Sequence, residues 1–161
     1  MSPRLRPVAG PVNYRVQAVT FRVVRDGAVA WTSRPTMSTP AEVVAVARQM
    51  IPDDSREHFL ALYLDSQNRL VATHEVSTGT LSASLVHPRE VYGPALRLMG
   101  VASIVLVHNH PSGDPKPSNE DLRLTRQLVE AGKLLDIRVH DHVIIGNGGD
   151  AYVSLAQRGH V

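Results

Sequence analysis

The most informative stretch of the 161-residue chain covers residues 102–121, which read ASIVLVHNHPSGDPKPSNED. Its first part, residues 102–107, is a continuous apolar run rich in β-branched side chains, which is typical of a central strand buried on both faces. Pro111 should end this strand. A proline-rich loop then leads to Ser118, the expected N-cap of a helix that ends near Ala131, with Gly132 directly after it.

The flanking sequence predicts further strands. Apolar runs bounded by turn residues predict strands at 59–64, 70–76 and 137–145. Strands that alternate with helices in this order predict an α/β fold, in which helices flank a mixed β-sheet with both parallel and antiparallel pairs.

Two more helices are expected before the central strand. Thr39 and Glu42 have the spacing of a capping box, so a helix should begin there and end before Pro52. The next helix should begin at Pro88 and end at Gly100, with a kink at a proline inside it, Pro94.

The N-terminal region differs in composition from the rest of the chain. Residues 1–12 contain three prolines and predict a loose tail, and residues 13–32 predict a β-hairpin around Asp26-Gly27. We therefore expect a tail at 1–12, a hairpin and linker at 13–37, and the main domain at 38–161. Residues 1–35 hold six arginines and one acid, so this arm could contact nucleic acid or simply be a solvated basic segment.

Composition excludes several classes of protein. The chain has no cysteine, which excludes disulfides and thiolate zinc sites. Aromatic residues make up only 4% of it, which argues against a surface that stacks single-stranded bases. No run of 18 apolar residues and no secretory signal are present, so the sequence predicts a cytoplasmic protein with no membrane partner.

The strand end and the helix start carry a candidate metal site. His108 and His110 are two residues apart on a strand and should project from the same face. Asp121, in the first turn of the next helix, can supply a third ligand. Two imidazoles and one carboxylate suit Zn²⁺, and three protein ligands leave a fourth position for water, which is the pattern of a catalytic site.

Each part of this pattern also has a simpler interpretation. Ser118 and Asp121 can form an N-cap with an acid that stabilises the first helical turn, and this role is compatible with metal binding by Asp121. The two histidines alone could be ordinary core or surface residues. The tripeptide His-Asn-His does not indicate an HNH nuclease, because the residues of that motif are spread over a longer ββα unit.

The same residues resemble a known signature. His108-x-His110 followed by Ser118-x-x-Asp121 is similar to the JAMM signature of MPN-domain (JAB-domain) metalloproteases. Together with SxGTL at 77–81, HPREV at 87–91 and DHVIIG at 141–146, it resembles the RadC-like branch over roughly residues 38–146. The resemblance implies a domain similar in outline to cytidine deaminase. Full-length members usually carry an N-terminal helix-hairpin-helix region, and its replacement by the expected hairpin weakens an inference to DNA binding.

The resemblance also implies roles for individual residues. Glu57 matches the general base, and Glu75 and Glu90 are alternatives that spacing alone does not exclude. Ser118 matches the residue that helps to hold the oxyanion. Apart from the resemblance, Asp141 is either an acceptor for the N–H of a ligand imidazole or simply an acid at the end of a strand. The remaining histidines are expected to be non-ligands. One of them, His142, should project from the opposite face of its strand to Asp141 and have a structural role.

These features lead to one preferred function and two alternatives. The preferred function is a zinc metallopeptidase that cleaves a peptide or isopeptide bond with a zinc-activated water. The alternatives are a metal-binding interaction module and a DNA-associated accessory protein, both without turnover. The sequence names neither the peptide or protein substrate nor the oligomeric state.

Overall fold

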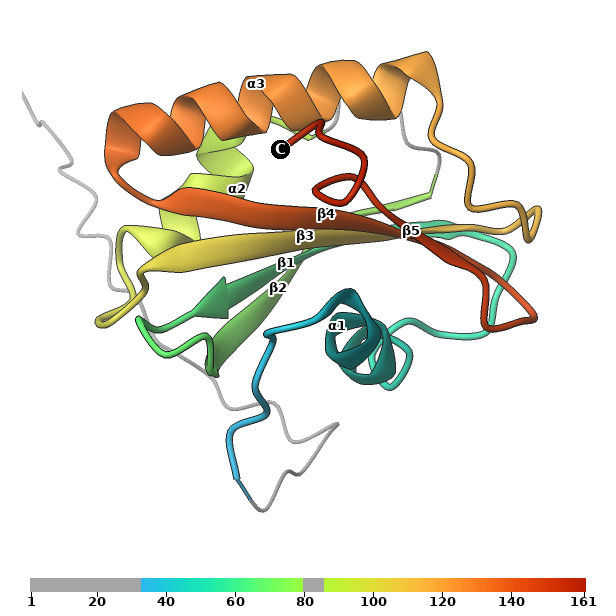
Figure 1. Cartoon of the computed structure of the whole chain (residues 1–161), viewed down its shortest axis with the longest axis horizontal. Coiled ribbons are helices and arrows are strands. Elements are labelled where there is room, and N and C mark those ends of the chain that lie inside the picture. Colours follow the sequence, from blue (N-terminus) through green and yellow to red (C-terminus); the bar gives the residue numbers. More distant parts are fainter. Residues whose placement is uncertain (1–32, 80–85) are drawn as a thin grey trace, which may run out of the picture.

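A computed structural model describes residues 33–79 and 86–161 (Figure 1). The expected tail at 1–12 and hairpin at 13–32 lie outside the described residues. The elements in chain order are α1 (Pro40–Ala47), β1 (Glu57–Leu64), β2 (Leu70–Gly79), α2 (Pro88–Ala95), β3 (Ser103–His110), α3 (Asn119–Leu135), β4 (Arg138–Gly146) and β5 (Tyr152–Ser154). None of the helices in this described part is long and apolar enough to cross a membrane.

The five strands form one mixed sheet in the order β2-β1-β3-β4-β5. Strand β1 runs antiparallel to both β2 and β3, β3 and β4 are parallel, and β5 returns antiparallel to β4. Helix α3 connects the parallel strands β3 and β4, which is the usual crossover for such a pair. The predicted α/β fold with a mixed sheet is confirmed.

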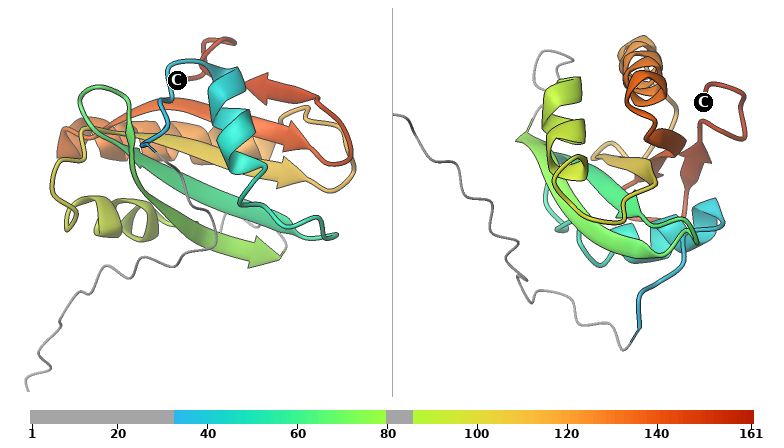
Figure 2. Two further views of the ribbon diagram at one scale, coloured as in Figure 1. Left: turned by 90° about the horizontal axis from the view of Figure 1, so that it is seen from below. Right: turned by 90° about the vertical axis from the view of Figure 1, so that its left-hand side faces the viewer.

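Helices cover both faces of the sheet (Figures 1 and 2). Helix α1 packs on one face, where its buried Val43 and Ala47 belong to the same apolar cluster as Leu62 and Val105. Helices α2 and α3 pack on the other face in a second cluster. Strands β1 and β3 contribute alternate residues to both clusters, so both strands are buried on both sides, as the apolar run at 102–107 predicted for β3.

The capping box predicted for α1 is present. The hydroxyl of Thr39 accepts a hydrogen bond from the backbone N–H of Glu42 at 3.3 Å, and the Glu42 carboxylate accepts from the Thr39 N–H at 2.9 Å. The regular helix ends at Ala47, and turns continue the chain to Ile51, directly before Pro52.

Helix α3 is longer than the sequence predicted. It continues to Leu135, and Asp136 adopts the left-handed conformation with φ of 55° directly after it. Gly132 is therefore inside the helix, and its backbone angle does not explain the glycine. A Cβ at Gly132 would lie 2.5 Å from both the Ile137 carbonyl oxygen and the Tyr92 hydroxyl, so close packing requires the glycine there.

The end of another helix was also wrong, and one short strand was missed. Helix α2 ends at Ala95 instead of Gly100, because the N–H of Arg97 donates three residues back, to the Pro94 carbonyl at 3.0 Å, which closes a tighter turn there. The three-residue strand β5 was not predicted, because a segment so short shows no period of alternation.

Candidate metal centre

Three side chains that were selected from the sequence converge where β3 ends and α3 begins. His108 and His110 project from the face of β3 that α3 covers, and Asp121 lies in the first turn of α3. The Nε2 atoms of the two histidines are 3.0 Å apart. The Asp121 carboxylate oxygens lie 3.3 Å from Nε2 of His108 and 3.5 Å from Nε2 of His110. The structure thus places these residues as a cluster that can hold a metal ion.

The cluster is largely closed to solvent. His108 is fully buried and Asp121 is 5% exposed, while the side chain of His110 is 16% exposed and forms the open side. The Nδ1 atom of His110 lies 2.8 Å from the Asp114 carbonyl oxygen. Because a carbonyl can only accept, this nitrogen carries the proton, and in the neutral ring Nε2 then presents a lone pair to the cluster.

The start of α3 holds the Asp121 carboxylate in place. The Ser118 N–H donates to Asp121 Oδ2 at 2.7 Å, and the Ser118 hydroxyl accepts from the Asp121 N–H at 3.1 Å. This capping box fixes the carboxylate at the helix N-terminus, where an anion is favoured. The two interpretations of Ser118 and Asp121 are therefore compatible in the structure.

Electrostatics at the cluster favour a cation. Burial raises the pKa of Asp121, but hydrogen bonds with His108 and His110 outweigh it and hold the pKa far below its usual range. The hydrogen bond with Asp121 raises the pKa of His110 above its ordinary value, and the negative charge of Glu57 acts in the same direction. An ionised carboxylate beside two imidazole nitrogens attracts either a proton or a metal ion.

Glu57 lies at the edge of this cluster. In the antiparallel pair of β1 and β3, Phe59 is opposite His108, and its ring stacks on the imidazole at a centroid distance of 5.9 Å. Glu57 lies two residues before Phe59 on β1, and His110 lies two residues after His108 on β3, so in this antiparallel pair both should project from the same face at the same end of the strands. The effect of Glu57 on the pKa of His110 agrees with this proximity.

The alternative bases lie elsewhere. Glu75 is opposite Leu60, on the sheet face that packs against α1, and its carboxylate is 2.5 Å from Nδ1 of His58. Glu90 is half-exposed at the start of α2 and pairs with its neighbour Arg89. Of the three candidates, the structure therefore brings only Glu57 next to the His-His-Asp cluster.

Asp141 does not accept from a ligand imidazole, and His142 lies on the other face of the strand from the one expected. Asp141 accepts hydrogen bonds from the Ser154 hydroxyl at 2.7 Å and the Ala156 N–H at 3.0 Å, so it anchors β5 and the turn that follows. His142 instead faces the His-His-Asp cluster, and its Nε2 lies 2.8 Å from Nδ1 of His108. The missing signal was the register: β4 pairs Leu106 with His142, which puts His142 on the same face as His108.

Asn109, between the two histidines, points to the opposite face of the sheet and is fully buried. Its Oδ1 accepts from the His58 N–H at 2.7 Å, and its Nδ2 donates to the Arg56 carbonyl at 3.0 Å and to Oδ1 of Asn147 at 3.0 Å. These bonds tie the backbone on both sides of Glu57 to the strand of the candidate ligands.

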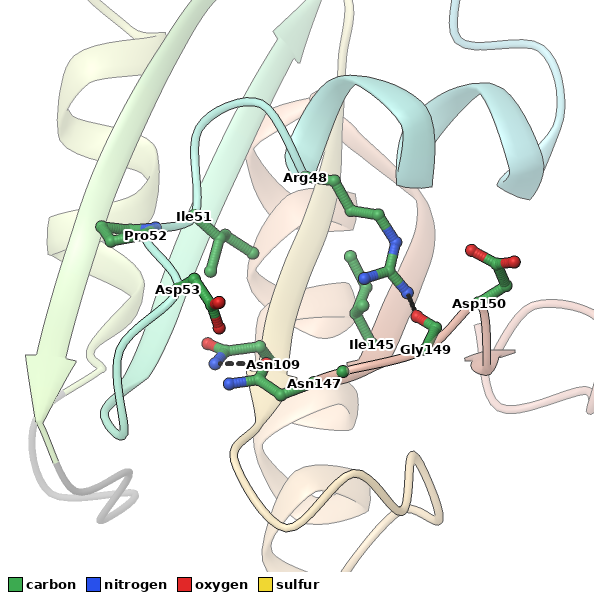
Figure 3. Close-up of a pocket in the computed structure, with 10 residues that line it drawn as sticks. Arg48, Ile51, Pro52, Asp53, Asn109, Ile145, Asn147, Gly149 and Asp150 are labelled. Atoms are coloured by element: carbon green, nitrogen blue, oxygen red, sulfur yellow. Dashed lines mark hydrogen bonds between the residues drawn. The ribbon is translucent and has the colours of Figure 1, made fainter.

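Beside Asn109 the opposite face is hollowed by a cavity of about 390 Å³ (Figure 3). Polar groups from the segment that follows α1 and from the turn between β4 and β5 line this cavity, among them Arg48, Asp53 and Asn147. Arg48 donates to the carbonyl of Gly149 across it. The sheet separates this cavity from His108 and His110, so the cavity is not part of the His-His-Asp cluster.

Comparisons with known proteins agree with this geometry. The family described as RadC-like JAB domain matches residues 37–160. The UPF0758 protein of Syntrophotalea carbinolica is 51% identical over 122 residues, which cover 76% of this chain and 52% of the relative. That of Methanosarcina acetivorans is 50% identical over 123 residues, which cover 76% of this chain and 52% of the relative.

A third relative aligns over more of the chain. The UPF0758 protein of Desulforamulus reducens is 43% identical over 151 residues, which cover 93% of this chain and 65% of the relative. The chain thus spans from about half to about two thirds of the length of these relatives. On the extent of the match and on these identities, the chain belongs to the RadC-like JAB domain family.

Proposed function

We propose that this chain is a zinc-dependent metallohydrolase that cleaves a peptide or isopeptide bond. The convergence of His108 Nε2, His110 Nε2 and the Asp121 carboxylate, with Glu57 at the edge of the cluster, is the observation that carries the proposal. Membership of a JAB-domain family, which includes metallohydrolases, supports it.

The donor set and its dimensions fit zinc. The two imidazole Nε2 atoms are 3.0 Å apart, and each lies 3.3 or 3.5 Å from an oxygen of the Asp121 carboxylate, Oδ1 for His108 and Oδ2 for His110, so one ion could reach all three side chains. Two imidazoles and a carboxylate without thiolates are ligands that zinc accepts in catalytic sites. When bound, Zn²⁺ supplies Lewis acidity, which lowers the pKa of a coordinated water from 15.7 to about 7.

Two residues of the chain then act on the substrate. The Glu57 carboxylate accepts a proton from the attacking water and returns it to the leaving amine. The Ser118 hydroxyl accepts from the Asp121 N–H at 3.1 Å, which leaves its own proton to donate to the developing oxyanion.

The test combines metal content with turnover. We expect one zinc per chain in the wild type and cleavage of members of a quenched peptide and isopeptide library. His108→Ala and Asp121→Asn should lose both the metal and the activity. His160→Ala is the matched control, because this exposed histidine lies near the C-terminus, outside the cluster, and should change neither.

The outcomes separate the possible functions. A wild-type chain that holds no zinc would contradict the proposal. Stoichiometric zinc with zinc-dependent binding of a protein partner, but without cleavage of any substrate, would favour the interaction module.

A further inference from the structure

His108 is linked to the backbone of Asp121, at the start of α3, by a series of buried hydrogen bonds through His142 and Thr125. Its Nδ1 is 2.8 Å from Nε2 of His142, and Nδ1 of His142 is 2.6 Å from the Thr125 hydroxyl. That hydroxyl also donates to the carbonyl of Asp121 at 2.6 Å. His108, His142 and Thr125 are all fully buried, so no water competes for these bonds.

The donor and the acceptor of each of these hydrogen bonds can be assigned by starting from the Asp121 carbonyl. The Asp121 carbonyl can only accept, so the single hydroxyl proton of Thr125 points to it. Toward His142 the hydroxyl must therefore accept, which places a proton on Nδ1 of His142. The Nε2 atom of the neutral His142 ring is then bare and accepts from Nδ1–H of His108.

We propose that Thr125 and His142 are positioning residues that fix the tautomer of His108, so that its Nε2 lone pair faces the metal site. The inference rests on the proposed metal site, since its purpose is to prepare a ligand. The Asp121 carbonyl at one end can only accept, so this backbone group of α3 decides which atom donates in each of the bonds up to His108. Partners of this kind orient ligand imidazoles and raise their basicity.

The ring contacts support a positioning role for His142. Its imidazole lies 4.9 Å from that of His108 and makes an edge contact with Phe59 at 5.4 Å, between ring centroids. Phe59 in turn stacks on His108. The ligand ring is thus held by a face contact on one side and by a hydrogen bond at the nitrogen away from the metal site.

The first test needs no substitution and no metal. Long-range ¹H–¹⁵N NMR of the histidine-labelled, metal-free chain at about pH 8, where ordinary imidazoles are neutral, reports the protonated nitrogen of each ring. We expect the Nδ1–H tautomer for both His108 and His142. A proton on Nε2 of His108 with none on its Nδ1 would overturn the inference.

The second test compares two substitutions of nearly equal size. Thr125→Val keeps the branched shape and removes the hydroxyl, whereas Thr125→Ser keeps the hydroxyl. We expect Thr125→Val to weaken zinc binding by about 10- to 100-fold in a chelator competition and to shift the ¹⁵N signals of both histidines. Thr125→Ser should restore the wild-type values.

The two proposals fail in different ways. If the wild type binds zinc and Thr125→Val binds it equally well, the positioning role is wrong and the metal site stands. If the wild type binds no zinc, the proposed metal site is wrong, and the tautomers of the metal-free chain still decide the direction of the hydrogen bonds.

Discussion

At the scale of single residues, Glu57 and Glu90 form a matched pair of carboxylates for testing general-base catalysis. Glu57→Gln keeps the size of the side chain but cannot accept the proton, so turnover should fall by about 10²–10⁴-fold. Zinc content and thermal stability should stay at the wild-type level, because Glu57 is not one of the three clustered ligands. Glu90→Gln, half-exposed on α2, should retain full activity.

Activity and zinc content, measured on the same preparations, decide this prediction. Loss of zinc in Glu57→Gln would make Glu57 a ligand. Normal turnover would remove it as the base.

Local sequence rules could predict some residues of the site and not others. The i and i+2 spacing of His108 and His110 is a local property of one strand, and Asp121 follows from the helix start. Contacts between strands depend on the register in which the strands pair, and the spacing of residues within one strand does not reveal that register. For that reason His142 was expected on the wrong face, and the choice among Glu57, Glu75 and Glu90 needed the pairing of β1 with β2 and β3.

At the scale of elements, the end of β4 supports the loop between β3 and α3. A Cβ at Gly146 would lie 2.1 Å from the Gly113 carbonyl oxygen, a contact that a backbone atom cannot relieve without moving. Gly146→Ala should therefore displace the loop and destabilise the fold by about 1–3 kcal/mol. It should also weaken zinc binding, because the Asp114 carbonyl in this loop orients His110.

Gly149→Ala is the control for this prediction, since a Cβ there would meet nothing within 4 Å. Urea denaturation and zinc competition of both variants provide the measurements. Equal stability and equal zinc affinity in the two variants would show that the loop does not depend on this close approach.

The elements themselves were predictable to different degrees. Long apolar runs and capping residues predicted α1, β1 and β3 close to where they lie. The end of α3 was misplaced because Gly132 usually signals a helix end, whereas here Tyr92 from α2 occupies the space that a side chain would need. Such packing between elements distant in sequence leaves no local pattern.

At the scale of the whole molecule, three charged groups should make stability depend on pH. His58 is 2% exposed and lies between Glu75, 2.5 Å from Nδ1, and Asp54, 2.9 Å from Nε2. Burial lowers the pKa of His58, but the hydrogen bonds with both carboxylates outweigh it and raise the pKa above 6.5. The hydrogen bond with His58 lowers the pKa of Asp54 and that of Glu75.

The direction of the pH effect follows from these shifts. The raised pKa of His58 stabilises the fold fully below about pH 6.5, and this stabilisation is lost as pH rises through the raised value. The lowered carboxyl pKa values stabilise the fold above about pH 4.5, and this is lost on acidification. Wild type should therefore exceed His58→Gln in free energy of unfolding by the largest margin between these two values.

Urea denaturation of both proteins at about pH 5.5 and about pH 9, with zinc removed by a chelator, measures this margin. A margin that stays constant, or that grows at alkaline pH, would mean that His58 is not charged in the folded protein.

The amide of Asn109 has a consequence for thermal motion. It holds the Arg56 carbonyl and the His58 N–H, the backbone groups on either side of Glu57, and it sits between His108 and His110 on the same strand. When the end of β3 fluctuates, the backbone of Glu57 is carried with it. The distances between the Glu57 carboxylate and the two imidazoles should therefore vary less than the position of any of these groups. Proton transfer by Glu57 would then be little affected by thermal motion at this end of the sheet.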